Sequence, residues 1–195
     1  MNAIVFDIET QNTFADVAND FKKLRISVVS VYRYATNEYA SFTEDELVKL
    51  WPILEKTDRL IGFNSLHFDL PIIHNYYPGD LTKIPHLDIM THIKDSLGFR
   101  LKLADVAEAT LDNITKSADG LTALRWWQEG RVDEVKRYCE QDVRVTKELY
   151  EFGKTNRQLF YKSLKGEVLP FAVNFDAPKV SAAATGSNIN LTLPF

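Results

Sequence analysis

The sequence predicts an α/β fold, and three features point to it. The chain begins with an apolar, strand-like run over residues 3–10, and two more β-rich runs follow over 26–34 and 38–42. Segments with apolar residues at helical spacing then alternate with short apolar runs. This alternation is typical of a sheet covered by helices. The 195 residues suffice for one well-buried core, so we expect a domain over 1–175 and a tail over 176–195, mobile or added as an edge strand.

The first predicted strand, Ala-Ile-Val-Phe-Asp-Ile-Glu-Thr over residues 3–10, carries two acids near its end. Side chains of a strand alternate between its faces, so Asp7 and Glu9 project from one side while Ile4, Phe6 and Ile8 point to the other. Two neighbouring carboxylates repel each other, and a divalent cation bound by their hard oxygen atoms would offset that repulsion. The strand therefore predicts a metal site whose other oxygen ligands come from elsewhere in the chain.

The next elements are read from residue type and helix capping. Residues 26–34 are β-branched and aromatic, and residues 38–42 form their expected antiparallel partner across a turn at 36–37. Thr43 and Glu46 have the spacing of a capping box, and Leu47, Leu50 and Leu54 follow at helical intervals. We therefore expect one helix from about 44 to 56.

A third acid stands where a strand passes into a helix. Residues 59–63 read as a short buried strand, and residues 64–69 connect it to a helix whose first turn accommodates Pro71. Asp69 is then expected at the start of that helix, where the helix dipole favours an ionised carboxylate. A further strand over 86–89 and helices over 101–110 and 121–128 follow. Asp88 fits either a group that supports the site or the cap of the helix after it.

A fourth acid interrupts the last long helix, predicted from about 131 into the 150s. Asp142 occupies a place where the apolar stripe of this helix expects an apolar side chain, and Tyr138 lies one turn before it on the same face. Beyond this helix the patterns are weaker, and residues 168–175 are expected to add an edge strand.

Composition restricts the compartment and the partners. No apolar run approaches the length of a membrane span, and Met1 leads into a strand without the features of a signal peptide, so we expect a cytoplasmic protein without membrane contact. The single cysteine, Cys139, excludes an internal disulfide. A net charge of −4 is unusual for a nucleic-acid-binding protein, but the four acids above carry that much charge, which two divalent cations would neutralise.

Taken singly, each acid also fits an ordinary structural role. The pair in the first strand can simply be exposed at the strand edge. Asp69 can serve only as a helix cap. Asp142 can belong to a buried ion pair with Arg137, Arg144 or Lys147.

Taken together, three segments resemble the exonuclease motifs of the DEDDy branch of the DEDD 3′–5′ exonuclease superfamily, also called DnaQ-like. They are Asp7-Ile8-Glu9, Asn64-x-x-x-Phe68-Asp69 and Tyr138-x-x-x-Asp142, in that order and over about three quarters of the chain. Residue 137 is Arg, so the histidine of the sister DEDDh branch is absent and Tyr138 assigns the branch. The resemblance implies a ribonuclease H-like α/β fold: a mixed central sheet with the first strand in its middle and helices on both faces.

The resemblance also implies a mechanism. Asp7 would bridge two divalent cations, Mg²⁺ or Mn²⁺, Glu9 and Asp142 would complete one of them, and Asp69 would hold the other through water. Two such ions activate a water molecule and stabilise the leaving 3′ oxygen of a phosphodiester. Tyr138 would orient that water, because a phenol with a pKa near 10 is a poor base at neutral pH. The expected activity is hydrolysis from a 3′ end to nucleoside 5′-monophosphates.

Substrate contacts and partners follow less directly. Residues after the first motif, where the family grips the terminal nucleotide, are candidates for phosphate or base contacts, and so is the asparagine of the second motif: Thr10, Phe14, Lys22, Lys23, Arg25 and Asn64. The expected partners are single-stranded or 3′-ended DNA or RNA, and a protein of replication, repair or RNA processing. Two alternatives remain: a catalytically silent nucleic-acid-binding or scaffold module with the same fold, and a metal-dependent endonuclease.

Overall fold

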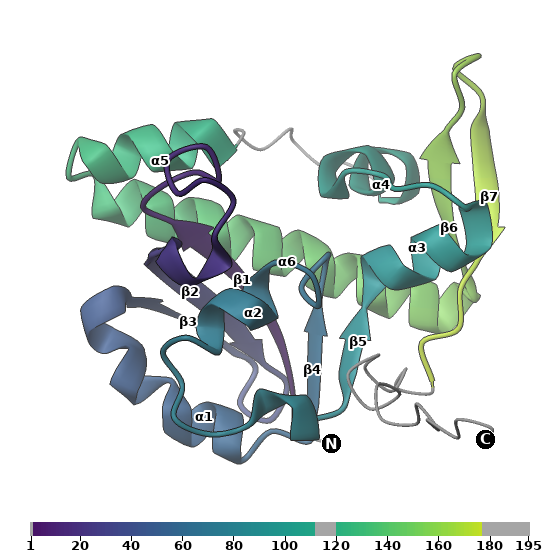
Figure 1. The fold of residues 1–195 in the computed structure, drawn as a ribbon. Helices are drawn as coiled ribbons and strands as arrows, with labels where there is room; N and C mark the ends of the chain where they lie inside the picture. Colours follow the sequence, from purple (N-terminus) through teal and green to yellow (C-terminus); the bar gives the residue numbers. More distant parts are fainter. Residues whose placement is uncertain (1, 112–119, 177–195) are drawn as a thin grey trace, which may run out of the picture.

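A five-stranded mixed sheet forms the centre of the molecule (Figure 1). The computed structural model describes residues 2–111 and 120–176. The strands are β1 (Ala3–Thr10), β2 (Ile26–Arg33), β3 (Glu38–Thr43), β4 (Arg59–Gly62) and β5 (His86–Asp88), in the order β3-β2-β1-β4-β5. β1 is antiparallel to β2 and parallel to β4. The predicted mixed sheet with the first strand in its middle is therefore confirmed.

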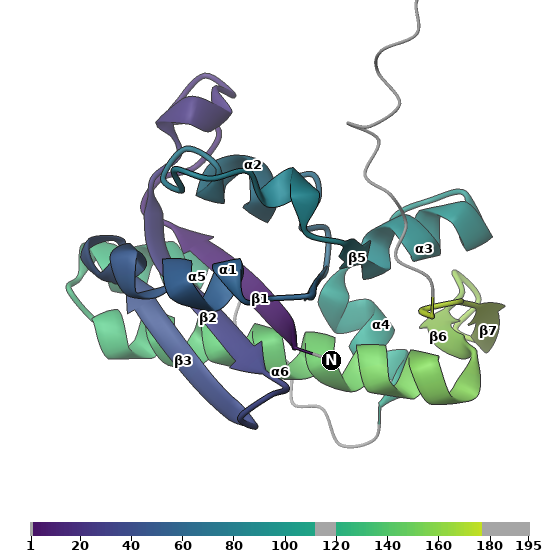
Figure 2. The same cartoon turned by 90° about the horizontal axis from the view of Figure 1, so that it is seen from below.

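Helices cover both faces of this sheet. The apolar residues of α1 (Trp51–Glu55) and α2 (Asp69–Ile73) pack against one face of the sheet, and those of α5 (Gly120–Gln128) and α6 (Val132–Asn156) pack against the other. Figure 2 shows these elements from below. The other helical segments are η1 (Phe21–Lys23), η2 (Glu44–Lys49), η3 (Leu81–Lys83), α3 (Ile89–Leu97) and α4 (Leu103–Thr110). Within the described ranges, no helix has both the length and the apolar character of a membrane span.

The alternation of β1 divides the core and places the first two acids. Ile4, Phe6 and Ile8 are buried in the cluster that contains the apolar residues of α1 and α2. Ala3 and Val5 face the opposite way and pack in the cluster that contains buried apolar residues of α6. Because Asp7 and Glu9 follow the same parity as Ala3 and Val5, they lie on the α6 side of the sheet.

The helix expected over 44–56 is wrong as a single element. Residues 44–49 form the 3-10 helix η2, and the α-helix α1 begins only at Trp51. The predicted capping box is present, with the Glu46 carboxylate accepting from the Thr43 backbone N–H at 3.3 Å. Pro52 accounts for the break, because it lacks an N–H and its ring conflicts with the carbonyl group four residues earlier in a continuous helix.

The C-terminal strand does not join the central sheet as expected. β7 (Val168–Ala172) pairs antiparallel with β6 (Gln158–Lys162), a strand that the sequence reading missed, and the two form a separate two-stranded sheet. Arg157, with a φ of 60°, ends α6 in the left-handed conformation and turns the chain directly into β6. The tail predicted over 176–195 lies outside the described residues from 177 onward.

Candidate active site

The edge of β1 is left open beside its acids. β4 pairs with β1 only from Ala3 to Val5, so the backbone of β1 beyond Val5 extends past its parallel neighbour. In that gap the Ile8 backbone N–H donates to Oδ1 of Asp69 at 3.0 Å. Asp69, which is 3% exposed, is therefore hydrogen-bonded to Ile8, the residue between Asp7 and Glu9.

A tight connection after β4 carries Asp69 to this position. Asn64 has a φ of 62°, a left-handed conformation that asparagine tolerates better than most residues. Gly62 is required by close approach, because a Cβ there would lie 2.2 Å from Oγ of Ser65. Oγ of Ser65 in turn hydrogen-bonds Nε2 of His86 at 2.8 Å. Asp69 is then the first residue of α2, with Pro71 in its first turn as expected.

The long helix α6 brings the fourth acid to the same place. One carboxylate oxygen from each of Asp7, Glu9 and Asp142 lies within 4.8 Å of the other two. Three basic residues were considered above as ion-pair partners of Asp142. Each of them forms an ion pair with a glutamate of α6: Arg137 with Glu134, Arg144 with Glu140, and Lys147 with Glu151.

Burial and mutual repulsion both raise the pKa values of the carboxylates at this site. Burial, followed by the charges of Asp69, Asp142 and Glu9, raises the pKa of Asp7 well above its usual value. Burial and the charges of Asp142 and Asp69 do the same to the pKa of Glu9. Burial raises the pKa of Asp69 to about 8, with the charge of Asp88 adding to the effect. Closely spaced anions with raised pKa values are typical of functional sites.

This donor set fits divalent cations. The three candidate ligand atoms, from Asp7, Glu9 and Asp142, are carboxylate oxygens, which are the preferred ligands of Mg²⁺ and Mn²⁺, whereas Zn²⁺ favours imidazole and thiolate. A bound cation would also relieve the repulsion that raises these pKa values. Asp7, Glu9 and Asp142 form the compact group, and Asp69, at the start of α2, is hydrogen-bonded to the backbone of β1 beside it.

Tyr138 lies at the same site, one turn before Asp142 on α6. Burial, then the negative charges of Asp142, Glu9 and Asp7, raise the pKa of its hydroxyl. Its ring stands edge-on to Trp126 of α5, with ring centroids 6.4 Å apart. The phenol is therefore protonated at neutral pH, a state in which it can donate and accept hydrogen bonds.

A pocket of about 480 Å³ opens beside the acids. Asp7, Glu9 and Asp69 are among the residues that line it. Most of the remaining wall is apolar and comes from the connection after β1, the connection after β4, and α5: Phe14, Leu24, Phe63, Phe68, Leu121 and Leu124. Its volume falls within the roughly 300–1,000 Å³ of small-ligand sites.

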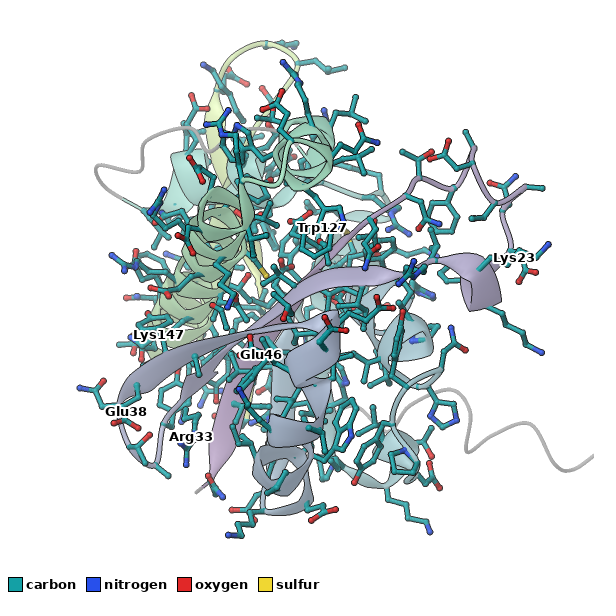
Figure 3. All side chains as sticks on the ribbon, turned by 90° about the vertical axis from the view of Figure 1, so that its left-hand side faces the viewer. Lys23, Arg33, Glu38, Glu46, Trp127 and Lys147 are labelled. Atoms are coloured by element: carbon teal, nitrogen blue, oxygen red, sulfur yellow. The ribbon has the colours of Figure 1, made fainter. Side chains whose placement is uncertain are left out.

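The candidate substrate contacts divide into two groups. Thr10 and Phe14 line the pocket, and the Phe14 ring stands edge-on to Phe68 at 5.8 Å. Lys22, Lys23 and Arg25 are exposed and are not among the residues that line the pocket. Figure 3 shows Lys23 at the outer edge of the molecule, on η1.

Arg25 and Asn64 have structural partners. The Arg25 guanidinium pairs with Glu44, whose carboxylate also accepts from Nε2 of Gln11 at 2.9 Å and from the Tyr76 hydroxyl at 2.8 Å. This network ties both ends of the connection after β1 to η2 and to the end of the α2 region. Asn64 accepts a hydrogen bond from Arg100 through Oδ1, and its backbone carbonyl accepts from Phe68 at 3.1 Å.

Cys139 is a neighbour of the site that sequence reasoning did not assign. Its Sγ lies 3.4 Å from the backbone carbonyl oxygen and 3.6 Å from Oδ2 of Asp7, and the side chain is fully buried. Burial raises the pKa of the thiol, so it serves Asp7 as a neutral, weak donor. The sequence signal that could have identified Cys139 as a neighbour of the site is its position in the apolar stripe of α6, three residues before Asp142.

The comparisons with known proteins agree with this architecture. A sequence model of the family described as the RNase_H superfamily matches residues 4–152, about three quarters of the chain. Among solved structures, the fold is similar to that of the family B DNA polymerase from the hyperthermophilic archaeon Pyrobaculum calidifontis, with a TM-score of 0.61 and 15% sequence identity. That match covers 78% of this chain and 24% of the polymerase chain.

A comparison with curated protein sequences finds no match. The structural likeness, at 15% identity, establishes the fold alone. The family match spans β1, the connection that carries Asp69, and most of α6, which are the elements that supply all four acids. On this evidence the chain belongs to the RNase H superfamily.

Proposed function

We propose that this protein is a 3′–5′ exonuclease that hydrolyses phosphodiester bonds with two divalent cations, Mg²⁺ or Mn²⁺. The observation that carries the proposal is the convergence of four acids, from three segments that are far apart in sequence, beside a pocket of about 480 Å³. A site of hard anionic oxygens has little structural benefit to the fold, because it raises the pKa of Asp7, Glu9 and Asp69. A catalytically silent scaffold has no need to retain it.

The roles we propose are those that the motif resemblance implies, and the grouping of the side chains supports them. Asp7, at the centre of the cluster, would contact both cations, Glu9 and Asp142 would complete one, and Asp69 would hold the other through water. The bound cations would supply a hydroxide-like nucleophile at neutral pH and stabilise the leaving 3′ oxygen. Tyr138 would donate to or accept from the attacking water and hold it in line with the phosphorus atom.

The pocket supports action at a strand end. One nucleotide is the unit that trimming removes, and a pocket of this size suits one nucleotide. Phe14 and Phe68 present aromatic surface on which a terminal base can stack, and Leu121 of α5 also lines the pocket. The 3′ direction rests on the resemblance of the three motifs.

The test measures the lengths of the products from end-labelled oligonucleotides, and the position of the label shows from which end the strand is shortened. Oligonucleotides of DNA and RNA, single- and double-stranded and labelled at the 5′ end, are incubated with the protein and Mn²⁺. We expect products that shorten one nucleotide at a time, and nucleoside 5′-monophosphates as the released species. Cleavage of a circular single strand would instead identify an endonuclease, and intact substrates with retained binding would identify a silent binding module.

Replacing Tyr138 by Phe is expected to lower kcat by roughly 10²-fold, because one positioned hydrogen-bond group is lost while the acids are unchanged. The concentration of Mn²⁺ at half-maximal activity should stay as in the wild type. Tyr161→Phe removes a hydroxyl on β6 and is the matched control, expected to retain full activity. A complete loss of activity in Tyr138→Phe together with weakened Mn²⁺ binding would contradict a purely orienting role.

We further propose that the domain works with a protein partner. One solved structure with a similar fold is a DNA polymerase, and the matched region is about a quarter of its chain. A partner that supplies phosphate contacts would compensate for the net charge of −4 on this chain.

A further inference from the structure

Asp88 is a buried acid that the mechanism above does not use. It ends β5, is 1% exposed, and uses both carboxylate oxygens to accept backbone N–H groups from two different elements. Oδ1 accepts from Met90 at 2.9 Å, which is the N-cap bond of α3 that the sequence reading anticipated. The same oxygen accepts from Asn64 at 2.7 Å, and Oδ2 accepts from Leu66 at 3.0 Å.

The two additional bonds fix the connection that delivers Asp69. Asn64 and Leu66 lie in the segment between β4 and α2, and the carbonyl group of Ser65, between them, accepts from the backbone N–H of Leu70 at 2.8 Å. β5 therefore holds this segment through the bonds of Asp88, and the first turn of α2 holds it through the bond between Leu70 and Ser65. Asp69 then reaches back to the Ile8 N–H on β1 at 3.0 Å.

An ionised carboxylate is the group that can make this arrangement. Three N–H donors converge on the two oxygens of Asp88, and an acceptor-only side chain satisfies all of them. An amide offers one oxygen and would direct its NH₂ group at one of the donors. A hydroxyl at this position can cap α3 but has one oxygen atom to share among three donors.

We propose that Asp88 is a positioning residue for the exonuclease reaction, which holds the segment over 64–68 so that Asp69 stands at the required distance from Asp7 and Glu9. This inference rests on the proposed function. Groups that orient metal ligands without touching the metal change metal affinity or activity by roughly 10–100-fold when they are removed. The expected effect of losing Asp88 is of that size, and it falls on kcat and on Mn²⁺ dependence, not on KM for the oligonucleotide.

The test compares Asp88→Ser with Asp88→Asn. Serine is a good N-cap, so it keeps the bond to Met90 and the start of α3 while releasing the segment over 64–68. Asparagine is nearly the same size as aspartate and loses one of the two acceptor oxygens. Asp80→Asn is the matched control, because Asp80 caps η3 with the same geometry, accepting from the Thr82 N–H at 3.0 Å, but is exposed and is not among the residues that line the pocket.

The first measurement is amide hydrogen exchange in EDTA, which does not depend on activity. We expect the N–H groups of Asn64 and Leu66 to exchange at least tenfold faster in Asp88→Ser than in the wild type, with the Ile61 N–H of β4 unchanged. In the second measurement, kcat falls by roughly 10–100-fold with KM within about twofold, and half-maximal activity requires more Mn²⁺.

Unchanged exchange at Asn64 and Leu66, or wild-type kcat in both variants, would overturn the proposal. Loss of the folded state in both variants would also overturn it, since Asp88 would then support the fold as a whole. If the wild type itself releases no mononucleotide, the proposed function fails, while the exchange measurement still decides whether Asp88 holds the segment.

Discussion

Replacing Asp7 by Asn is expected to abolish 3′ trimming while making the metal-free protein more stable. Asp7 is the central member of the cluster, and its loss should lower kcat by roughly 10³-fold or more. The same change removes a buried group that Asp69, Asp142 and Glu9 repel. In EDTA at pH 8 the unfolding temperature should rise by roughly 2–4 °C, equivalent to about 1 kcal/mol for a chain of this size.

Asp133→Asn is the control for this experiment. Asp133 is an exposed acid in the first turn of α6, the helix that also carries Asp142, so its replacement changes the net charge equally without altering the site. Both its activity and its response to Mn²⁺ should match the wild type. Substantial activity in Asp7→Asn, or a lower unfolding temperature in EDTA, would show that the cluster is structural.

The metal-free protein is expected to lose stability as the pH rises from 6.5 to 9, and divalent cations are expected to reverse that loss. Folding raises the pKa of Asp69 to about 8, whereas the same carboxyl titrates near 4 in the unfolded chain. Between those values the folded state binds more protons than the unfolded state, so unfolding becomes easier with increasing pH. Asp7 and Glu9, whose pKa values are also raised, act in the same direction.

Thermal unfolding in EDTA and in Mn²⁺, at several pH values, measures this effect. The range begins at pH 6.5 because burial lowers the pKa of His86 to about 4, which has the opposite influence on stability below that pH. Bound Mn²⁺ requires ionised carboxylates, so its stabilising effect should grow with pH and reach about 2.7 kcal/mol at 100 times its Kd. A metal-free unfolding temperature that rises between pH 6.5 and 9 would contradict the account.

Three acids of the site could be anticipated because each breaks a local pattern. Asp7 and Glu9 occupy an apolar strand and Asp142 occupies an apolar helical stripe, so a misfit in periodicity marked them. The central position of β1 and the two-sided covering of the sheet followed from the same patterns together with the family resemblance. Periodicity could not predict how close the acids lie to one another. The hydrogen bond from the Ile8 N–H to Asp69 forms because β4 pairs with β1 only as far as Val5 and leaves that N–H open.

Other features depend on contacts that no local pattern records. Arg25 read as a phosphate contact, but its position beside Glu44 is set by the packing of η2 against the start of β2. Asp88 read as a cap, and its bonds to Asn64 and Leu66 require β5 to pair with β4. β6 was missed because five residues directly after a long helix carry too weak an alternation to stand out.

The most direct test of the central claim is to count Mn²⁺ ions by anomalous scattering from crystals of the wild type and of Asp7→Asn. The account predicts two peaks in the wild type, both within coordination distance of the carboxylates of Asp7, Glu9, Asp69 and Asp142 or of waters bound to them. It predicts the loss of at least one peak in Asp7→Asn. Wild-type crystals with no peak among these four acids, or with Mn²⁺ bound only elsewhere, would contradict it.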